Sequence, residues 1–229
     1  MSLYCPNCKI YDLKFTSHYR CVNCKEAYEY DVPEAHFPIK KIKSRALNPW
    51  RYREAIPFDT DSVSLGEIQT PLVKCKISGN DILLKCEHYL PTGSYKDRGS
   101  VTLIAGLKSN NIQEIVEDSS GNAGASLAAY AARAAISLKV FCPSSASEQK
   151  KIQIKRYGAE LVTIDGPRIK STEALLNHVT KTDAFYASHL WNPMFLLGIQ
   201  TMAYELVEQL GWRVPKAVIC PVGSGSILI

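Results

Sequence analysis

From Gly66 onward, the sequence alternates between short apolar runs rich in β-branched residues and longer segments with a helical pattern. The runs that we expect to form strands are 82–84, 114–116, 138–141, 161–164 and 217–220. Residues 123–135 contain eight alanines, which favour a closely packed helix, and the apolar residues of 195–210 repeat with a helical period. Strands that alternate with helices predict an α/β fold with a parallel sheet covered on both faces.

Composition narrows the class of protein further. Of the 229 residues, 46% are hydrophobic and 21% are charged, which is typical of a globular chain and excludes a disordered one. The net charge of +5 suits an anionic ligand and does not indicate a nucleic-acid partner. No apolar run reaches the roughly 18 residues of a membrane span, and residues 1–6 do not resemble a secretory leader. We therefore expect a cytoplasmic protein without a membrane partner.

The N-terminal segment 1–30 carries a metal-binding pattern. Two Cys-x-x-Cys knuckles, formed by Cys5, Cys8, Cys21 and Cys24, are separated by twelve residues. Four thiolates at this spacing predict a structural zinc ribbon. Residues 31–65, which contain prolines and a basic cluster, are expected to be a linker. Because zinc ribbons also occur in proteins that are not enzymes, a zinc-ribbon binding module remains an alternative.

Three loops carry the residues with potential chemistry, and each follows an expected strand, where α/β sheets bind ligands. Lys96 lies in the first turn of a helix, where the helix dipole disfavours the ammonium form and favours a nucleophilic amine. The loop 118–124 combines hydroxyl, glycine and amide residues that can bind an anion through backbone N–H groups. The small residues of 221–226 allow a phosphate to approach the backbone. Taken singly, the last two loops are equally well explained as ordinary turns.

Together and in this order, the motifs resemble those of the fold-type II pyridoxal-phosphate enzymes, most closely the threonine synthases. Residues 91–99 read Pro-Thr-Gly-Ser-Tyr-Lys-Asp-Arg-Gly, residues 119–126 read Ser-Ser-Gly-Asn-Ala-Gly-Ala-Ser, and a small-residue loop follows Pro-Val-Gly at 221–223. The resemblance implies two three-layer α/β/α domains with mainly parallel sheets, preceded by the zinc ribbon. The large domain would comprise 66–94 and 196–229, and the small domain 95–195.

The resemblance also implies roles for individual residues. Lys96 would form an aldimine with pyridoxal 5′-phosphate and move protons, and Asn122 would hydrogen-bond the phenolic oxygen of the cofactor. The cofactor phosphate would lie against Gly223, Ser224, Gly225 and Ser226. The substrate carboxylate would be bound by Ser119, Ser120 and Gly121. Candidates for a substrate phosphate, by charge alone, are Arg98, Lys150, Lys151, Lys155 and Arg156; the last four also fit a solvated helix face.

The implied reaction converts O-phospho-L-homoserine and water to L-threonine and phosphate, in a homodimer. Related enzymes with the same loops leave two alternatives: a cysteate synthase, which would use phosphoserine and sulfite, and a serine or threonine dehydratase. In this family the chain normally continues well beyond the phosphate loop, whereas this sequence stops at Ile229. We therefore expect an incomplete large domain, and an inactive or poorly soluble fragment is a third alternative.

Overall fold

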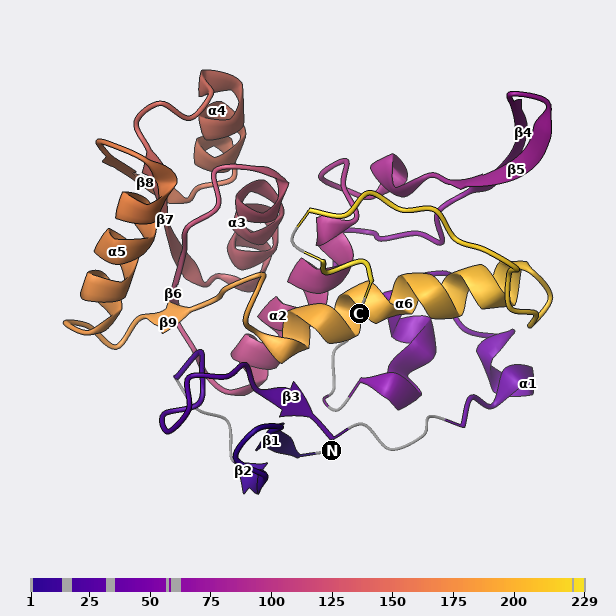
Figure 1. Ribbon diagram of the computed structural model, residues 1–229, viewed down its shortest axis with the longest axis horizontal. Helices are drawn as coiled ribbons and strands as arrows, with labels where there is room; N and C mark the ends of the chain where they lie inside the picture. The colour runs from indigo at the N-terminus through magenta and orange to yellow at the C-terminus, as the bar shows by residue number, and fades with distance from the viewer. Residues whose placement is uncertain are drawn as a thin grey trace.

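The computed structural model describes residues 2–13, 18–31, 36–56, 58, 63–223 and 225–228 (Figure 1). The N-terminal segment forms a small antiparallel sheet of β1 (Leu3–Cys5), β2 (Ile10–Leu13) and β3 (Glu29–Tyr30), in the order β2-β1-β3. Its own small core contains Leu3, Cys5, Cys21 and Tyr28. Within the described part of the chain, no helix has the length and apolarity needed to cross a membrane.

The main sheet is parallel, as the alternating pattern predicts. It contains β6 (Glu114–Glu117), β7 (Ser137–Pro143), β8 (Glu160–Ile164) and β9 (Phe185–Tyr186), in the order β8-β7-β6-β9. Three of these strands coincide with expected runs. The short strand β9 does not, because two residues are too few to show a sequence pattern.

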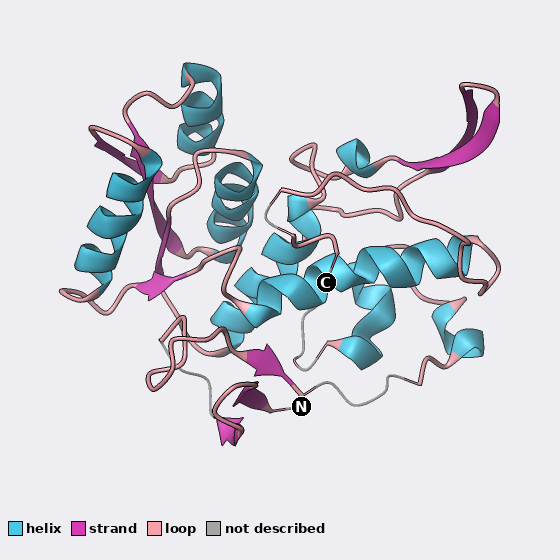
Figure 2. Ribbon diagram, in the orientation of Figure 1, coloured by secondary structure: helices cyan, strands magenta, loops and turns pink. Residues whose placement is uncertain are grey.

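Helices cover both faces of this sheet, which gives a three-layer arrangement (Figure 2). On one face, α3 (Asn122–Ala134) and α4 (Glu148–Arg156) join the larger apolar cluster, which contains Ile115, Leu138 and Val140 from the strands. On the other face, α5 (Arg168–Val179) packs through Leu175 against Val116 and Phe141. The chain therefore passes over one face between β6 and β8 and over the opposite face between β8 and β9.

Two long helices, α2 (Lys96–Ser109) and α6 (Pro193–Gln209), cross at close range beside this sheet. Glycines allow the approach: a Cβ atom at Gly198 would lie 1.9 Å from the carbonyl oxygen of Arg98, and one at Gly99 would lie 2.5 Å from the Phe195 ring. Because backbone and ring cannot both move away, no larger residue fits either position. This crossing fixes the start of α2, and with it Lys96, relative to α6.

The remaining described segments form no second parallel sheet. They comprise α1 (Ile39–Ile42), the 3₁₀ helices η1 (Pro49–Ala55) and η2 (Glu87–Tyr89), and an antiparallel ribbon of β4 (Leu72–Ile77) and β5 (Asn80–Lys85). The expected run 82–84 lies in β5, and so pairs antiparallel with β4. The run 217–220 was wrongly expected to form a strand: it pairs with no described strand, and a strand needs a hydrogen-bonding neighbour. Of the two expected three-layer domains, the described residues contain one.

Candidate functional site

Lys96 is the first residue of α2 and lies in a largely enclosed position, only 9% exposed. Its Nζ atom donates a hydrogen bond of 3.3 Å to Ser226 Oγ, 130 residues away in the sequence. The amine also lies 4.4 Å from the centre of the Tyr95 ring and 5.7 Å from that of Phe195. The structure thus brings the expected nucleophile and the last residue of the expected phosphate loop together, beside two aromatic rings.

Asp97 stabilises the loop before Lys96 through hydrogen bonds. Its carboxylate accepts hydrogen bonds from the backbone N–H of Thr92 at 2.6 Å and from the hydroxyls of Thr92 at 2.5 Å and Ser126 at 2.6 Å. Burial raises the pKa of Asp97, and the hydrogen bonds from Ser126 and Thr92 oppose that rise. Because Ser126 belongs to α3, Asp97 joins the Lys96 loop to the helix that follows the anion-binding loop.

The loop 119–122 leads into α3 with open backbone donors. Gly121 is the N-cap residue and supplies no side chain to satisfy the first N–H groups of the helix, which makes this end suited to an anion. Ser119 is buried, Ser120 is half-buried and Asn122 is exposed. A Cβ atom at Gly124 would lie 1.8 Å from the carbonyl oxygen of Ser119, so this glycine is required for the loop to fold back on the helix.

Of the cations proposed by charge, Lys150 approaches Gly121 of this loop. Its Nζ is 4.0 Å from the position that a Cβ atom would take at Gly121. Lys151 instead bonds the carbonyl oxygen of Ser144 at 2.7 Å and Glu148 at 3.0 Å. Lys155 and Arg156 are exposed, in agreement with the solvated-face interpretation.

Arg98 is occupied within the protein. It is fully buried, and its guanidinium bonds Glu87 at 2.7 and 2.8 Å and Glu205 at 3.0 Å, with further bonds to Thr70 and Thr201. These carboxylates raise the pKa of Arg98 against the effect of burial. The expectation that Arg98 binds substrate therefore finds no support in the geometry, and we leave it out of the site.

The loop 221–226 approaches Lys96 at its far end. Ser226 is buried and lies 3.3 Å from the Tyr95 hydroxyl as well as from Lys96 Nζ, whereas Gly223 is exposed. Gly225 has a left-handed φ of +87°, and a Cβ atom at either glycine would meet only open space. Ser224 lies outside the described residues. The buried Lys96 amine beside Ser226 of the small-residue loop fits pyridoxal 5′-phosphate, whereas no hydrogen bond joins the exposed Asn122 to Lys96 within the described structure.

A buried pair, His189 and Glu117, lies at the carboxyl edge of the main sheet and belongs to none of the sequence motifs. His189 Nδ1 and Glu117 Oε1 are 2.6 Å apart, and both residues are buried. Burial raises the pKa of Glu117, and the His189 ring opposes that rise. The signal that could have revealed the pair is position, because each residue follows or ends a strand at the carboxyl edge of the sheet. The brevity of β9 conceals that position in the sequence.

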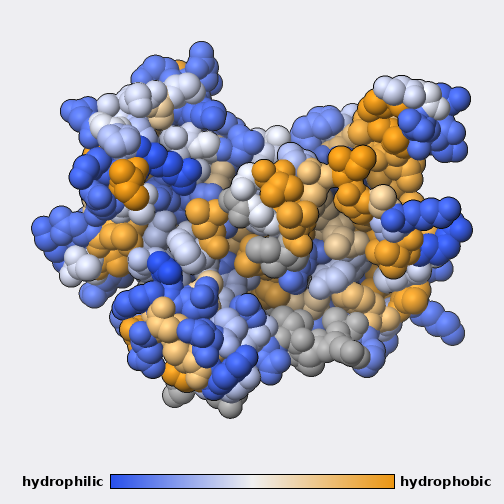
Figure 3. All heavy atoms as spheres, viewed as in Figure 1, coloured by the Kyte–Doolittle hydropathy of each residue, from blue (hydrophilic) through white to orange (hydrophobic). Residues whose placement is uncertain are grey.

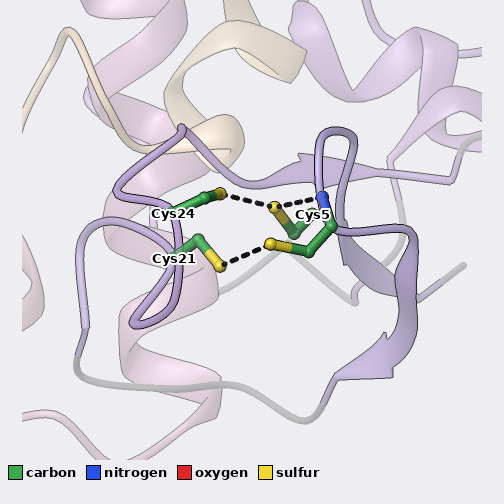
Figure 4. A group of neighbouring side chains, drawn as sticks. Cys5, Cys21 and Cys24 are labelled. Atoms are coloured by element: carbon green, nitrogen blue, oxygen red, sulfur yellow. Dashed lines mark hydrogen bonds between the residues drawn. The ribbon is translucent and has the colours of Figure 1, made fainter.

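The four N-terminal cysteines converge as expected (Figure 4). Their sulfur atoms all lie within 4.8 Å of one another, with Cys5 and Cys24 3.5 Å apart and Cys8 and Cys21 3.9 Å apart. Tetrahedral zinc with Zn–S bonds of about 2.3 Å separates its ligands by roughly this distance. Both knuckles also end alike, with Lys9 and Lys25 in left-handed conformations and bonded back to the first cysteine carbonyl. The cluster therefore fits a metal ion.

Comparison with known proteins relates this chain to one family. Residues 63–229 match the family model described as pyridoxal-phosphate dependent enzyme. A threonine synthase from Methanocaldococcus jannaschii is 31% identical over 90% of this chain and 58% of its own length. A serine racemase from Mus musculus is also 31% identical, over 73% of this chain and 50% of its own.

Solved structures show the same fold. A cysteine synthase from Entamoeba histolytica has a TM-score of 0.64 at 23% identity and covers 73% of this chain and 53% of its own. The chain spans about half the length of the relatives that it matches. On the match over residues 63–229, this chain belongs to the family of fold-type II pyridoxal-phosphate-dependent enzymes.

Proposed function

We propose that this chain carries the active site of a threonine synthase, which converts O-phospho-L-homoserine and water to L-threonine and phosphate. The observation that carries the proposal is the buried Lys96 amine beside Ser226, in a loop that the Asp97 hydrogen bonds hold to α3. A threonine synthase is 31% identical to this chain over 90% of this chain's length. A structural zinc ion would lie in the four-cysteine cluster.

The described residues suggest how the site works. Lys96 would hold pyridoxal 5′-phosphate covalently, and the bound cofactor supplies an electron sink for carbanions. The N-terminus of α3 would bind the α-carboxylate of the substrate, which positions the α-carbon. Lys96 would then take protons from the α- and β-carbons and return them to the γ- and α-carbons. The rings of Tyr95 and Phe195 exclude water from the amine.

The cofactor assignment is tested by borohydride reduction. After incubation with pyridoxal 5′-phosphate and reduction, peptide mass analysis should place a pyridoxyl group on Lys96. The variant Lys96→Ala should lose this adduct, whereas Lys108→Ala, changed at an exposed lysine of the same helix, should retain it. An adduct at another lysine, with Lys96 unmodified, would refute the assignment.

The substrate assignment is tested by product analysis on cofactor-loaded protein. We expect release of phosphate from O-phospho-L-homoserine together with threonine. Formation of cysteate from phosphoserine and sulfite, or of a keto acid from serine or threonine, would instead support the two alternatives. A chain that binds the cofactor at Lys96 but acts on none of these substrates would leave the family and cofactor assignments intact and refute the threonine synthase proposal.

A further inference from the structure

The buried pair Glu117 and His189 lies where this sheet changes its winding direction. Glu117 ends β6, and His189 follows the neighbouring parallel strand β9 (Figure 1). The chain leaves β6 over the face that carries α3 and reaches β9 from the face that carries α5. Open parallel sheets bind ligands in the crevice at such a switch point. The pair thus occupies a position at which this fold places groups that contact ligands.

The pair faces the same side of the sheet as Lys96. Ile115 packs in the cluster shared with α2, α3 and α6, and Val116 packs in the cluster shared with α5. Because side chains alternate along a strand, Glu117 points to the same face as Ile115. The His189 ring lies edge-on to Phe195, with ring centres 6.1 Å apart, and Lys96 Nζ lies 5.7 Å from that same ring. Lys96 and His189 therefore both contact one aromatic side chain.

Hydrogen bonding leaves one ring nitrogen of His189 available. Nδ1 bonds Glu117, whereas Nε2 has no hydrogen-bonding partner among the described residues. The second carboxylate oxygen of Glu117 is buried and also has none within the described structure. Asp118 and Arg168 are the other charged groups that influence Glu117, and no hydrogen bond joins either to His189. A histidine oriented by a carboxylate through one nitrogen presents the other nitrogen to a substrate.

We propose that His189, held by Glu117, is the acid–base group for the leaving phosphate of the substrate, a role that rests on the proposed function. As the bond between the γ-carbon and the ester oxygen breaks, its electron pair goes to that oxygen, and the imidazolium donates its Nε2 proton to the departing phosphate. The neutral imidazole then takes a proton from the water whose oxygen bonds to the β-carbon. This second transfer restores the imidazolium, so that Lys96 and His189 serve opposite ends of the substrate.

Sulfate is a suitable probe for this site, because it keeps two negative charges over the pH range in which histidine titrates. Calorimetry on the cofactor-loaded chain should show sulfate binding about tenfold tighter near pH 6 than near pH 8, since only the imidazolium donates from both nitrogens. The variant His189→Gln should lose this pH dependence. The control His178→Gln, changed on α5 where His178 packs against Phe141, should retain it.

A second variant keeps the test decisive if His189→Gln does not fold. Glu117→Gln replaces the carboxylate that orients the His189 ring through Nδ1, so sulfate binding near pH 6 should weaken. In turnover, His189→Gln should lower kcat for phosphate release about 100-fold and remove one limb of its pH profile. Sulfate binding that is absent, or unaffected by pH and by Glu117→Gln, would overturn the inference.

The outcomes also separate the two proposals. If His189→Gln formed threonine with the same pH profile as the wild type, the role of His189 would be overturned and the proposed function would stand. Conversely, pH-dependent sulfate binding that requires His189, in a protein that does not act on O-phospho-L-homoserine, would support an anion site at His189 and refute the proposed function.

Discussion

At the scale of single residues, Arg98 lies within the motif 91–99 but stabilises the fold through internal ion pairs. Its guanidinium bridges Glu87 of η2 and Glu205 of α6, and Glu205 has a side-chain exposure of only 1%. Lys85 also contacts Glu205, so several charges share this buried site. Arg98 therefore joins the start of α2, the helix that begins with Lys96, to the preceding η2 and to α6, which is about 100 residues away in the sequence.

Replacement of Arg98 by Met should destabilise the protein by about 3–5 kcal/mol, because it leaves buried carboxylates without their main partner. Urea unfolding monitored by circular dichroism measures this loss. Lys108→Met, a change of the same type at an exposed position of α2, should change the free energy of unfolding by less than about 0.5 kcal/mol. If Arg98→Met kept wild-type stability but failed to bind the substrate, the substrate-binding role that charge alone suggested for Arg98 would be restored.

At the scale of elements, the N-terminal ribbon packs against the loop that carries His189. The Arg20 guanidinium lies 4.2 Å from the centre of the Trp191 ring, and the ring centres of Tyr19 and Tyr186 are 5.0 Å apart. Trp191 follows His189 closely in the segment between β9 and α6. The cysteine cluster therefore supports a segment that belongs to the proposed site.

Loss of Cys8, a proposed metal ligand, should loosen this segment. The variant Cys8→Ser should bind less zinc by elemental analysis and should show faster amide hydrogen exchange at 187–192, because the ribbon no longer holds its contacts with Trp191 and Tyr186. Cys75→Ser, in β4, serves as the control and should change neither measurement. Faster exchange confined to residues 2–31 would show that the ribbon folds without supporting the loop.

The 3₁₀ helix η1 is joined to the end of α6 by one carboxylate. Glu208 accepts hydrogen bonds from Arg51 at 2.6 and 2.8 Å and from the Tyr52 hydroxyl at 2.7 Å. The Arg51 hydrogen bond holds the pKa of Glu208 below its ordinary value of 4.5. Segment 31–65, expected as a linker, thus contains an element anchored to the fold.

The lowered pKa of Glu208 has a defined consequence for stability. A carboxyl whose pKa is lower in the folded state stabilises that state above about pH 4.5, and the stabilisation is lost as the pH falls through the folded-state pKa. Glu208→Gln should therefore melt at a lower temperature than wild type near pH 7, and the difference should shrink below about pH 4. Melting curves by circular dichroism at the two pH values test this. An equal difference at both values would contradict the role of this carboxylate.

Periodicity and length decide which elements the sequence reveals. The helix of 123–135 and the strands at 114–116, 138–141 and 161–164 are visible in the sequence because each has an apolar pattern, and the structure confirms them. The strand β9 is too short for any pattern, and 217–220 has the composition of a strand but pairs with no strand that the structure describes. Local pattern predicts an element, whereas pairing depends on other segments of the chain.

At the scale of the whole molecule, the site is assembled from distant segments. The motifs identified Lys96 and the loops 119–122 and 221–226, and the parallel topology implied that such loops gather at one edge. The sequence could not show that Ser226 contacts Lys96, or that Arg98 forms buried ion pairs with Glu87 and Glu205. Both contacts depend on tertiary packing. It also concealed Glu117 and His189, which no motif connects.

The whole molecule also exposes apolar segments that suit association with another surface. In 217–222, Val218 is 63% exposed, Ile219 is 98% exposed and Val222 is 62% exposed, and Val73 and Leu84 of the β4–β5 ribbon are each 45% exposed. Figure 3 shows apolar residues where the C-terminal segment and the β4–β5 ribbon lie. Exposed strand-like segments without pairing partners promote contacts between chains.

A polypeptide of these 229 residues should therefore self-associate through 217–222. Sedimentation velocity at increasing concentration should show growing oligomers for the wild-type chain, and Ile219→Lys should shift the distribution toward monomer, because a charge at the most exposed apolar position opposes burial. Ile169→Lys, at a residue of α5 that is 58% exposed, provides a matched control and should leave the distribution unchanged. Equal effects of the two substitutions would indicate that added charge alone governs association, and a monomeric wild-type chain would show that the exposed segment attracts no second copy.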